Sequence, residues 1–174
     1  MEFLTLAKKR CSTRSFKKQA ILDTEITSIL EAARVAPTNG NIQNFHIYVV
    51  EDRDLLAQFA EHAQIYNAPL VFVVSYDKEK IFKSAINAND TGLIDTSVIL
   101  THMMLAATDL KLGSVWINYF KQADIKAVLK TGPSEEIAHL LAVGYPNVPF
   151  KDQKRHAKER KPLTELVSYK RNPE

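Results

Sequence analysis

Two basic segments, near opposite ends of the chain, carry side chains suited to hold a phosphate group. The first, Arg10–Arg14, alternates arginines with hydroxyl residues, and the second, Lys158–Lys161, places cations just before a proline. A guanidinium offers a planar fork that matches phosphate oxygens, and hydroxyls add further donors. The chain's five glycines, at positions 40, 92, 113, 132 and 144, are scattered and form no glycine-rich phosphate loop. A phosphate would therefore be held by side-chain cations such as Arg10, Lys158 and Arg160, although each segment alone is typical of a solvated surface.

A polar loop, Ala36–Phe45, is the third segment whose side chains could bind a ligand. Pro37 ends the preceding helical pattern, and Asn39 and Gly40 both tolerate positive φ, so the chain can turn sharply here. The loop offers uncharged donors and acceptors, which suit a neutral ligand with several polar edges. These side chains are Thr38, Asn39, Asn41 and Gln43. An ordinary surface turn is the alternative interpretation of this loop taken alone.

Alternating helix and strand patterns must position these segments. Helices are expected at 2–9, 23–35, 52–65, 90–111 and 121–129, and strands at 45–50, 70–75, 114–118 and 138–143. Asp23 or Thr24 is expected to cap the second helix, and Asn89 or Asp90 should begin the helix 90–111, with Gly113 ending it. The strand 70–75 is apolar almost throughout, so both its faces should be buried. Strands that alternate with helices predict a layered α/β or α+β sandwich.

The expected helix 90–111 carries more apolar residues than one face can hold. A surface helix needs an apolar stripe of only about 100°, so this helix should be buried nearly all round. In a chain of 174 residues, such a helix favours a second subunit that supplies part of the cover, and a two-fold dimer is the commonest arrangement.

Composition places the chain among ordinary globular proteins. It has 45% hydrophobic and 25% charged residues, a net charge of +3 and a single cysteine. The charge is too small to argue for nucleic acid, and one cysteine excludes an internal disulfide and fits a reducing cytoplasm. We find no leader pattern, membrane-spanning run, repeat or linker, so residues 1–174 are expected to form one domain.

Five motifs in order resemble those of the flavin-dependent nitroreductase family, across nearly the whole chain. The first is Arg10, Ser12 and Arg14 followed by Phe16, and the second is Ala36, Pro37, Thr38, Asn41 and Gln43 in the polar loop. The others are Met104–Ala107 with Leu110–Gly113, Trp116-Ile117 followed by Val143–Pro146, and Arg160–Leu163.

The resemblance implies an α+β fold: a three-layer sandwich of a mixed, mainly antiparallel sheet flanked by helices, with the long central helix at a homodimer interface. It also implies an FMN cofactor reduced by NAD(P)H, and reduction of nitroaromatic, quinone or similar acceptors by a ping-pong mechanism. Hydride transfer takes place at the flavin N5, so no catalytic side chain is required. Arg14 is expected to stabilise the charge on the reduced flavin.

The remaining site residues are also assigned by the resemblance. Arg10, Cys11 and Ser12, with Lys158 and Arg160, are placed at the phosphate and ribityl chain. Trp116, Ile117 and Asn118 would present backbone groups to the N5 side of the ring. Pro37, Thr38, Asn39, Asn41 and Gln43 would contact the ring or ribityl chain, partly from the partner subunit.

Two departures and two alternatives remain. Asn44-Phe45 replaces the family's Pro-Trp and should loosen the loop, and the connection 76–89 is short, which implies a shallow, permissive site. The flavin could instead support reductive dehalogenation or flavin fragmentation, or the protein could bind flavin with little turnover. A remote alternative is an anionic-partner or nucleic-acid binding module using Lys151–Lys161, which has six cations against two acids but no aromatics for base stacking.

Other reactive side chains are given lesser roles. The Cys11 thiol lies in the positive field of its neighbouring arginines, yet the resemblance requires no catalytic thiol there. His102 is more simply interpreted as a satisfied interior or interface histidine than as a proton donor. His46, Asp90 and Asp95 have no metal-ligand spacing, so no metal is expected.

Overall fold

The computed structural model describes residues 2–83, 86 and 89–171, and its centre is a four-stranded sheet. The strands are β1 His46–Val50, β2 Leu70–Asp77, β3 Gly113–Ile117 and β4 Glu135–Gly144, in the order β1-β2-β4-β3. All three neighbouring pairs are antiparallel. A single parallel bridge, Ser12 to Ser114, adds the N-terminal segment to the free edge of β3. The sheet is therefore mixed and mainly antiparallel, as predicted.

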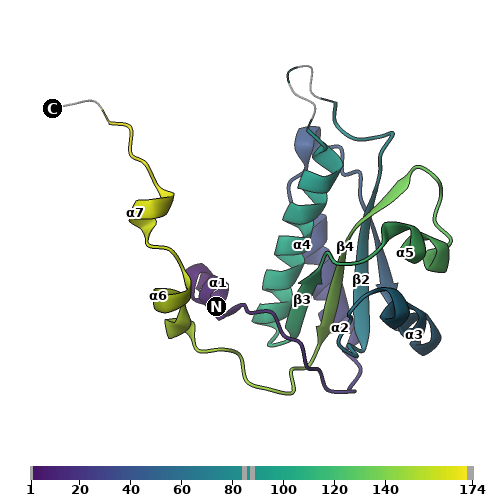
Figure 1. Ribbon diagram of the computed structural model, residues 1–174, viewed down its shortest axis with the longest axis horizontal. Helices are drawn as coiled ribbons and strands as arrows, with labels where there is room; N and C mark the ends of the chain where they lie inside the picture. Colours follow the sequence, from purple (N-terminus) through teal and green to yellow (C-terminus); the bar gives the residue numbers. More distant parts are fainter. Residues whose placement is uncertain (1, 84–85, 87–88, 172–174) are drawn as a thin grey trace.

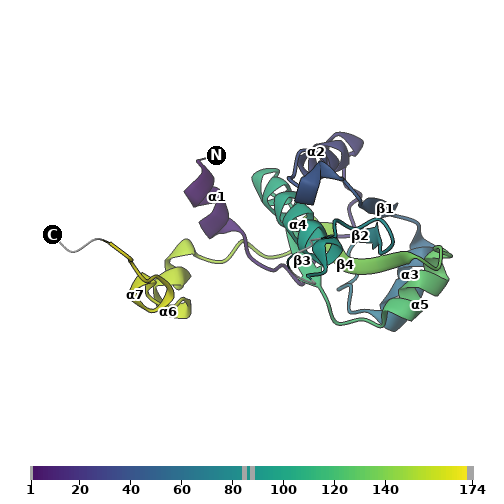
Figure 2. The same ribbon diagram turned by 90° about the horizontal axis from the view of Figure 1, so that it is seen from above.

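Helices cover both faces of this sheet, which makes three layers (Figures 1 and 2). Helices α2 Asp23–Arg34 and α4 Thr91–Asp109 pack on one face, and α3 Arg53–His62 and α5 Gln122–Leu129 pack on the other. Strand β2 lies in the middle and contributes alternate residues to the two cores: Phe72 faces α2 and α4, whereas Val71 and Val73 face α3 and α5. This explains why its sequence is apolar on both faces. The α+β sandwich is confirmed.

The long helix α4 is not enclosed all round within one chain. Leu100 and Met103 are fully buried against the sheet, but Leu93 and Ile94 are each 45% exposed. Ile94 begins a stripe at helical spacing that continues through the half-buried Val98 and Leu105. The single chain therefore buries one side of α4 and leaves an apolar stripe open, which is the part of the helix for which cover from a second subunit is expected.

Two helix ends differ from the expectation. Leu22, not Asp23 or Thr24, is the N-cap of α2, and its amide donates to the Glu25 carboxylate at 3.1 Å. Asp90 caps α4 as expected, but Lys111 takes the left-handed turn after α4, with φ of 64°. The Leu112 amide then donates to the Ala107 carbonyl at 2.8 Å, which closes the last turn.

Gly113 instead allows the N-terminal segment to pack closely against the start of β3. A Cβ built at this position would lie 2.6 Å from Cγ2 of Thr13, on the segment that bridges to the strand edge. A side chain here would push the N-terminal segment away from the sheet.

Three segments outside the sandwich complete the chain. Helix α1 Phe3–Lys9 precedes the bridging segment, and the short helix η1 Asn39–Asn41 lies in the polar loop. After β4 the chain leaves the sandwich as an arm that carries η2 Gln153–Arg155, α6 His156–Glu159 and α7 Leu163–Leu166 (Figures 1 and 2). Every residue from 157 to 171 is exposed. Within the described part of the chain, no helix is both long and apolar enough to cross a membrane.

Candidate active site

A cluster of arginines forms where the C-terminal arm meets the N-terminal segment. Arg155 donates from Nη2 to the carbonyl oxygens of Arg10, at 2.9 Å, and Lys8, at 3.2 Å. His156 Nε2 lies 2.9 Å from the same Lys8 oxygen. Burial lowers the pKa of Arg10, and the positive charges of Arg155 and Arg160 lower it further. We call Arg10, Arg155 and Arg160 the arginine cluster.

The structure brings the two basic segments together in the arginine cluster, although they are about 150 positions apart in the sequence. Guanidinium groups repel one another, so an anion between them would relieve the repulsion and form charge-assisted hydrogen bonds. Arg155 is a member that the sequence motif missed. Its only signal in the sequence is that it belongs to the basic run 151–161. The Arg155 guanidinium donates to backbone carbonyl oxygens of the same chain. Lys158 is exposed on α6, two residues before Arg160.

The segment after Arg10 follows the free edge of β3. The Thr13 amide donates to the Ser114 carbonyl at 2.9 Å, beside the bridge from Ser12. Cys11 is buried and Ser12 is half-buried. Exposed Arg14 lies with its guanidinium 5.9 Å from the Tyr66 ring centroid.

At the other end of β3, a polar network joins four side chains. The indole Nε1 of Trp116 donates to Asn118 Oδ1 at 2.6 Å and lies 3.2 Å from His139 Nδ1. His139 Nδ1 is 3.0 Å from Asn118 Oδ1, and its Nε2 is 3.0 Å from Ser97 Oγ on α4. The Ile117 side chain points away into the buried core shared with α3 and α5. Burial lowers the pKa of His139 to about 4, so the ring is neutral at pH 7.

The polar loop is fastened to α4 through a buried carboxylate. Asp95 Oδ1 accepts from the Asn39 amide at 3.0 Å and from Asn39 Nδ2 at 2.7 Å. Gly40, Asn41 and Gln43 all have positive φ, between 53° and 59°. The Gln43 amide donates to Thr38 Oγ1 at 3.0 Å, which closes the turn. Pro37, Asn41 and Gln43 of the polar loop are exposed and remain available for a ligand.

Asn44 does not loosen this loop, contrary to the expectation. Its Nδ2 donates to the Asp77 carbonyl at 2.8 Å, and the Asp77 amide donates to Asn44 Oδ1 at 3.2 Å. An amide side chain can pair with a backbone unit at both its donor and its acceptor. Asn44 thus extends the β1–β2 pairing to a position two residues before β1 begins.

The predicted site residues nevertheless fall into two groups within one chain. Asp95 and Ser97 are two positions apart on α4, and at 3.6 residues per turn they point about 200° apart. The polar loop and the Trp116 network therefore lie on different sides of α4. A single chain therefore does not place the polar loop beside the Trp116 network.

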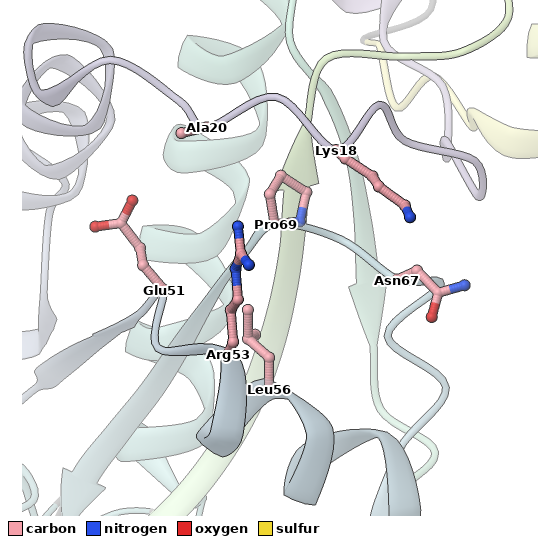
Figure 3. Close-up of a pocket in the computed structure, with 7 residues that line it drawn as sticks. All are labelled: Lys18, Ala20, Glu51, Arg53, Leu56, Asn67 and Pro69. Carbon is pink, nitrogen blue, oxygen red and sulfur yellow. The ribbon is translucent and has the colours of Figure 1, made fainter.

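The hollows of the surface only partly coincide with these groups. The cavity in Figure 3, about 420 Å³, lies between the N-terminal segment, the start of α3 and Pro69, and none of the predicted site residues lines it. A second cavity, of about 490 Å³, is lined by Asn118, Tyr119 and Phe120. It opens beside the Trp116 network, at the end of β3 that the resemblance assigns to the flavin ring.

Comparison with known proteins decides the family. The nitroreductase family model matches residues 7–65 and 63–145. The chain belongs to the nitroreductase family. A putative NADH dehydrogenase/NAD(P)H nitroreductase of Archaeoglobus fulgidus is 32% identical over 161 residues, 88% of either chain.

Two further relatives agree with this membership. The crystal structure of a nitroreductase family protein from Clostridium difficile superposes with a TM-score of 0.94, at 36% identity over 98% of this chain and 99% of that one. An NADPH-flavin oxidoreductase of Vibrio harveyi is 27% identical over 90% of this chain and 68% of its own. The family recognised from the motifs is thus confirmed.

Proposed function

We propose that this nitroreductase family member is an NAD(P)H-dependent flavin oxidoreductase that binds FMN and reduces nitroaromatic, quinone or similar small acceptors. The arginine cluster carries the proposal. It lies at the start of the β3 edge, and the Trp116–Asn118 end lies about 13 Å further along, at roughly 3.3 Å per residue. A phosphate in the cluster and a ring beside Asn118 would place the ribityl chain along this edge. Residues 1–174 act as one FMN-binding domain in this proposal.

The chain's own residues bind and orient the cofactor. Arg10 and Arg160, with Lys158 nearby, hold the phosphate, and Cys11 and Ser12 contact the chain that follows it. Trp116, Ile117 and Asn118 align the ring through the end of β3. Bound FMN supplies the hydride acceptor, and the protein supplies orientation and electrostatics.

Electrostatic stabilisation falls to Arg14. Its side chain is exposed beside Tyr66, and in this proposal it turns towards the bound flavin. A positive charge there favours the reduced, negatively charged cofactor. NAD(P)H and the acceptor then use the same open face in turn, which gives ping-pong kinetics.

A homodimer completes the site. The polar loop of one chain would cover the ring held by the other, because the polar loop and the Trp116 network of the same chain lie on different sides of α4. The open stripe along α4 provides apolar contact area, and the arm adds Leu163 and Tyr169, which are 74% and 73% exposed. Large exposed apolar groups on an extended arm are typical of a segment that packs on a partner.

The first test is the identity and the affinity of the cofactor. The purified protein should be yellow, and mass analysis of the released cofactor should give FMN; FAD at full occupancy would contradict the proposal. Arg160→Ala should weaken FMN binding about ten- to hundredfold, because a charge-assisted hydrogen bond contributes roughly 1.5–3 kcal/mol. Lys154→Ala, in the same basic run and exposed, is the matched control and should bind FMN normally.

The second test separates Arg14 from the arginine cluster. Arg14→Ala should lower the flavin's reduction potential and slow turnover with NAD(P)H and a quinone, with little change in FMN affinity. The physical reason is that Arg14 meets charge formed on reduction, whereas the phosphate is charged in both redox states. An unchanged potential in Arg14→Ala would show that this arginine has another role.

A further inference from the structure

His139 occupies an unusual place in the sandwich, because a polar ring interrupts the apolar run of β4. It is only 3% exposed and is followed by the fully buried Leu140 and Leu141. Its ring packs edge-on against the Trp116 indole, with centroids 4.9 Å apart and an interplanar angle of 82°. A buried imidazole costs free energy unless both its nitrogens find partners. Both do, and the partners lie on different elements, α4 and the end of β3.

The hydrogen bonds around the ring engage both of its nitrogens. The Trp116 indole N–H is a donor only, and it points at Asn118 Oδ1 and His139 Nδ1. Asn118 Oδ1 also lies 3.0 Å from His139 Nδ1, and the Ser97 hydroxyl, which is 2.7 Å from the Leu93 carbonyl oxygen, lies 3.0 Å from His139 Nε2. In either tautomer of the neutral ring, one nitrogen donates and the other accepts within this network: Nε2–H can donate to Ser97 while Nδ1 accepts from Trp116, or Nδ1–H can donate to Asn118 while Nε2 accepts from Ser97. Because Ser97 lies on α4, the His139 ring links the Trp116 indole to that helix.

We propose that His139 is a positioning residue, which holds the Trp116 indole and the Asn118 amide in one orientation at the end of β3. The inference rests on the proposed function, since that end of β3 is where the flavin ring would lie. It extends the proposal by assigning the alignment of the ring contacts to a residue that touches neither cofactor nor substrate. Asn118 is exposed and lines the 490 Å³ cavity, so the network joins the buried core to the mouth of that cavity.

A purely space-filling histidine would not produce this arrangement. A leucine at 139 would fill a similar volume and continue the apolar run, with no polar groups to satisfy. It would leave the indole N–H with Asn118 Oδ1 alone, on an exposed side chain that is free to rotate. The expected consequence is a mobile Trp116 and Asn118 in an otherwise intact sandwich.

The experiment uses the fact that Trp116 is the chain's single tryptophan. The ¹⁵N-labelled holoprotein should therefore give one indole N–H cross-peak by NMR, shifted downfield by its hydrogen bonds. In His139→Leu this peak should move upfield and broaden, and kcat/KM with NAD(P)H and a quinone should fall about tenfold, the equivalent of one hydrogen bond. His139→Asn keeps an amide oxygen near the Nδ1 position, so its peak and its kinetics should return to within about threefold of wild type.

Ser97→Ala provides a second route that leaves the imidazole in place. It removes only the partner of Nε2, and it should produce a smaller displacement of the same indole peak. This variant also keeps the test informative if His139→Leu does not fold, as judged by thermal unfolding.

Two results would overturn the positioning role: an indole peak and turnover unchanged in His139→Leu, or a His139→Asn variant as impaired as His139→Leu, which would show that an acceptor near the Nδ1 position does not orient the indole. A wild-type protein that binds no FMN would instead contradict the proposed function, and the indole peak would still decide the positioning role.

Discussion

Replacement of Asp95 tests whether the polar loop of one chain serves the site of the other. Asp95 is buried, and one of its oxygens accepts two hydrogen bonds from Asn39. Hydrogen bonds to a charged group contribute roughly 1.5–3 kcal/mol each and are not fully additive, so Asp95→Ala should destabilise the ordered loop by about 2–4 kcal/mol. If FMN binds only when the loop is ordered, even 2 kcal/mol raises the apparent Kd about 30-fold.

The assay is calorimetric titration of FMN into the apoprotein, with urea unfolding measured in parallel. Asp95→Asn keeps an acceptor oxygen without the charge, so about half the effect is expected. Asp54→Asn, exposed on α3 across the sheet, is the matched control and should leave FMN affinity unchanged. Loss of stability in Asp95→Ala with an unchanged Kd would refute the assignment of the loop to the site.

A mixed dimer makes the test sharper. One chain carries Asp95→Ala and the other carries Arg160→Ala. In a shared site, one of the two sites combines both defects and the other combines an intact arginine cluster with an intact loop. The heterodimer should then bind one FMN with wild-type affinity. A heterodimer with no wild-type site would show that each site is built from a single chain.

Three further outcomes are expected. Gly113→Ala should destabilise the fold by about 1–3 kcal/mol in denaturant unfolding, because its Cβ would collide with Thr13, whereas Gly132→Ala has open space around its Cβ and should be neutral. His139 binds protons less readily in the folded than in the unfolded state, and the groups it contacts are uncharged. The free energy of unfolding should therefore fall between about pH 6.5 and about pH 4, by at most about 3 kcal/mol, and a His139→Leu variant should lack this slope in acid unfolding curves. Ile94→Glu should dissociate the dimer and release FMN, as measured by light scattering and absorbance; a flavin-loaded monomer would contradict the shared site.

The choice of Ile94 shows where sequence reasoning about α4 was incomplete. Leu100 and Met103 carry the same apolar signal in the sequence, but both are fully buried inside their own chain, so a charge at either would unfold the core rather than test the interface. Hydrophobic periodicity shows how much apolar surface a helix has. It does not show which part the chain covers by itself.

The sequence by itself determined the elements, their order and the family. The apolar patterns predicted all four strands and the five main helices to within a few residues at most ends, because these patterns record local geometry and burial. The ordered motifs identified the family, and the resemblance assigned Arg10 and Arg160 to the same phosphate.

The tertiary structure decided which side chains meet. Arg155 joins the arginine cluster, and His139 holds Trp116, through contacts between residues distant in the sequence, for which no local spacing gives a signal. Asn44 looked like a weakened motif until its pairing with Asp77 was visible. The separation of the polar loop from the Trp116 network depends on the packing around α4, because neighbouring positions on a helix point in different directions. That separation, which only the folded chain reveals, is the physical reason to place the site between two subunits.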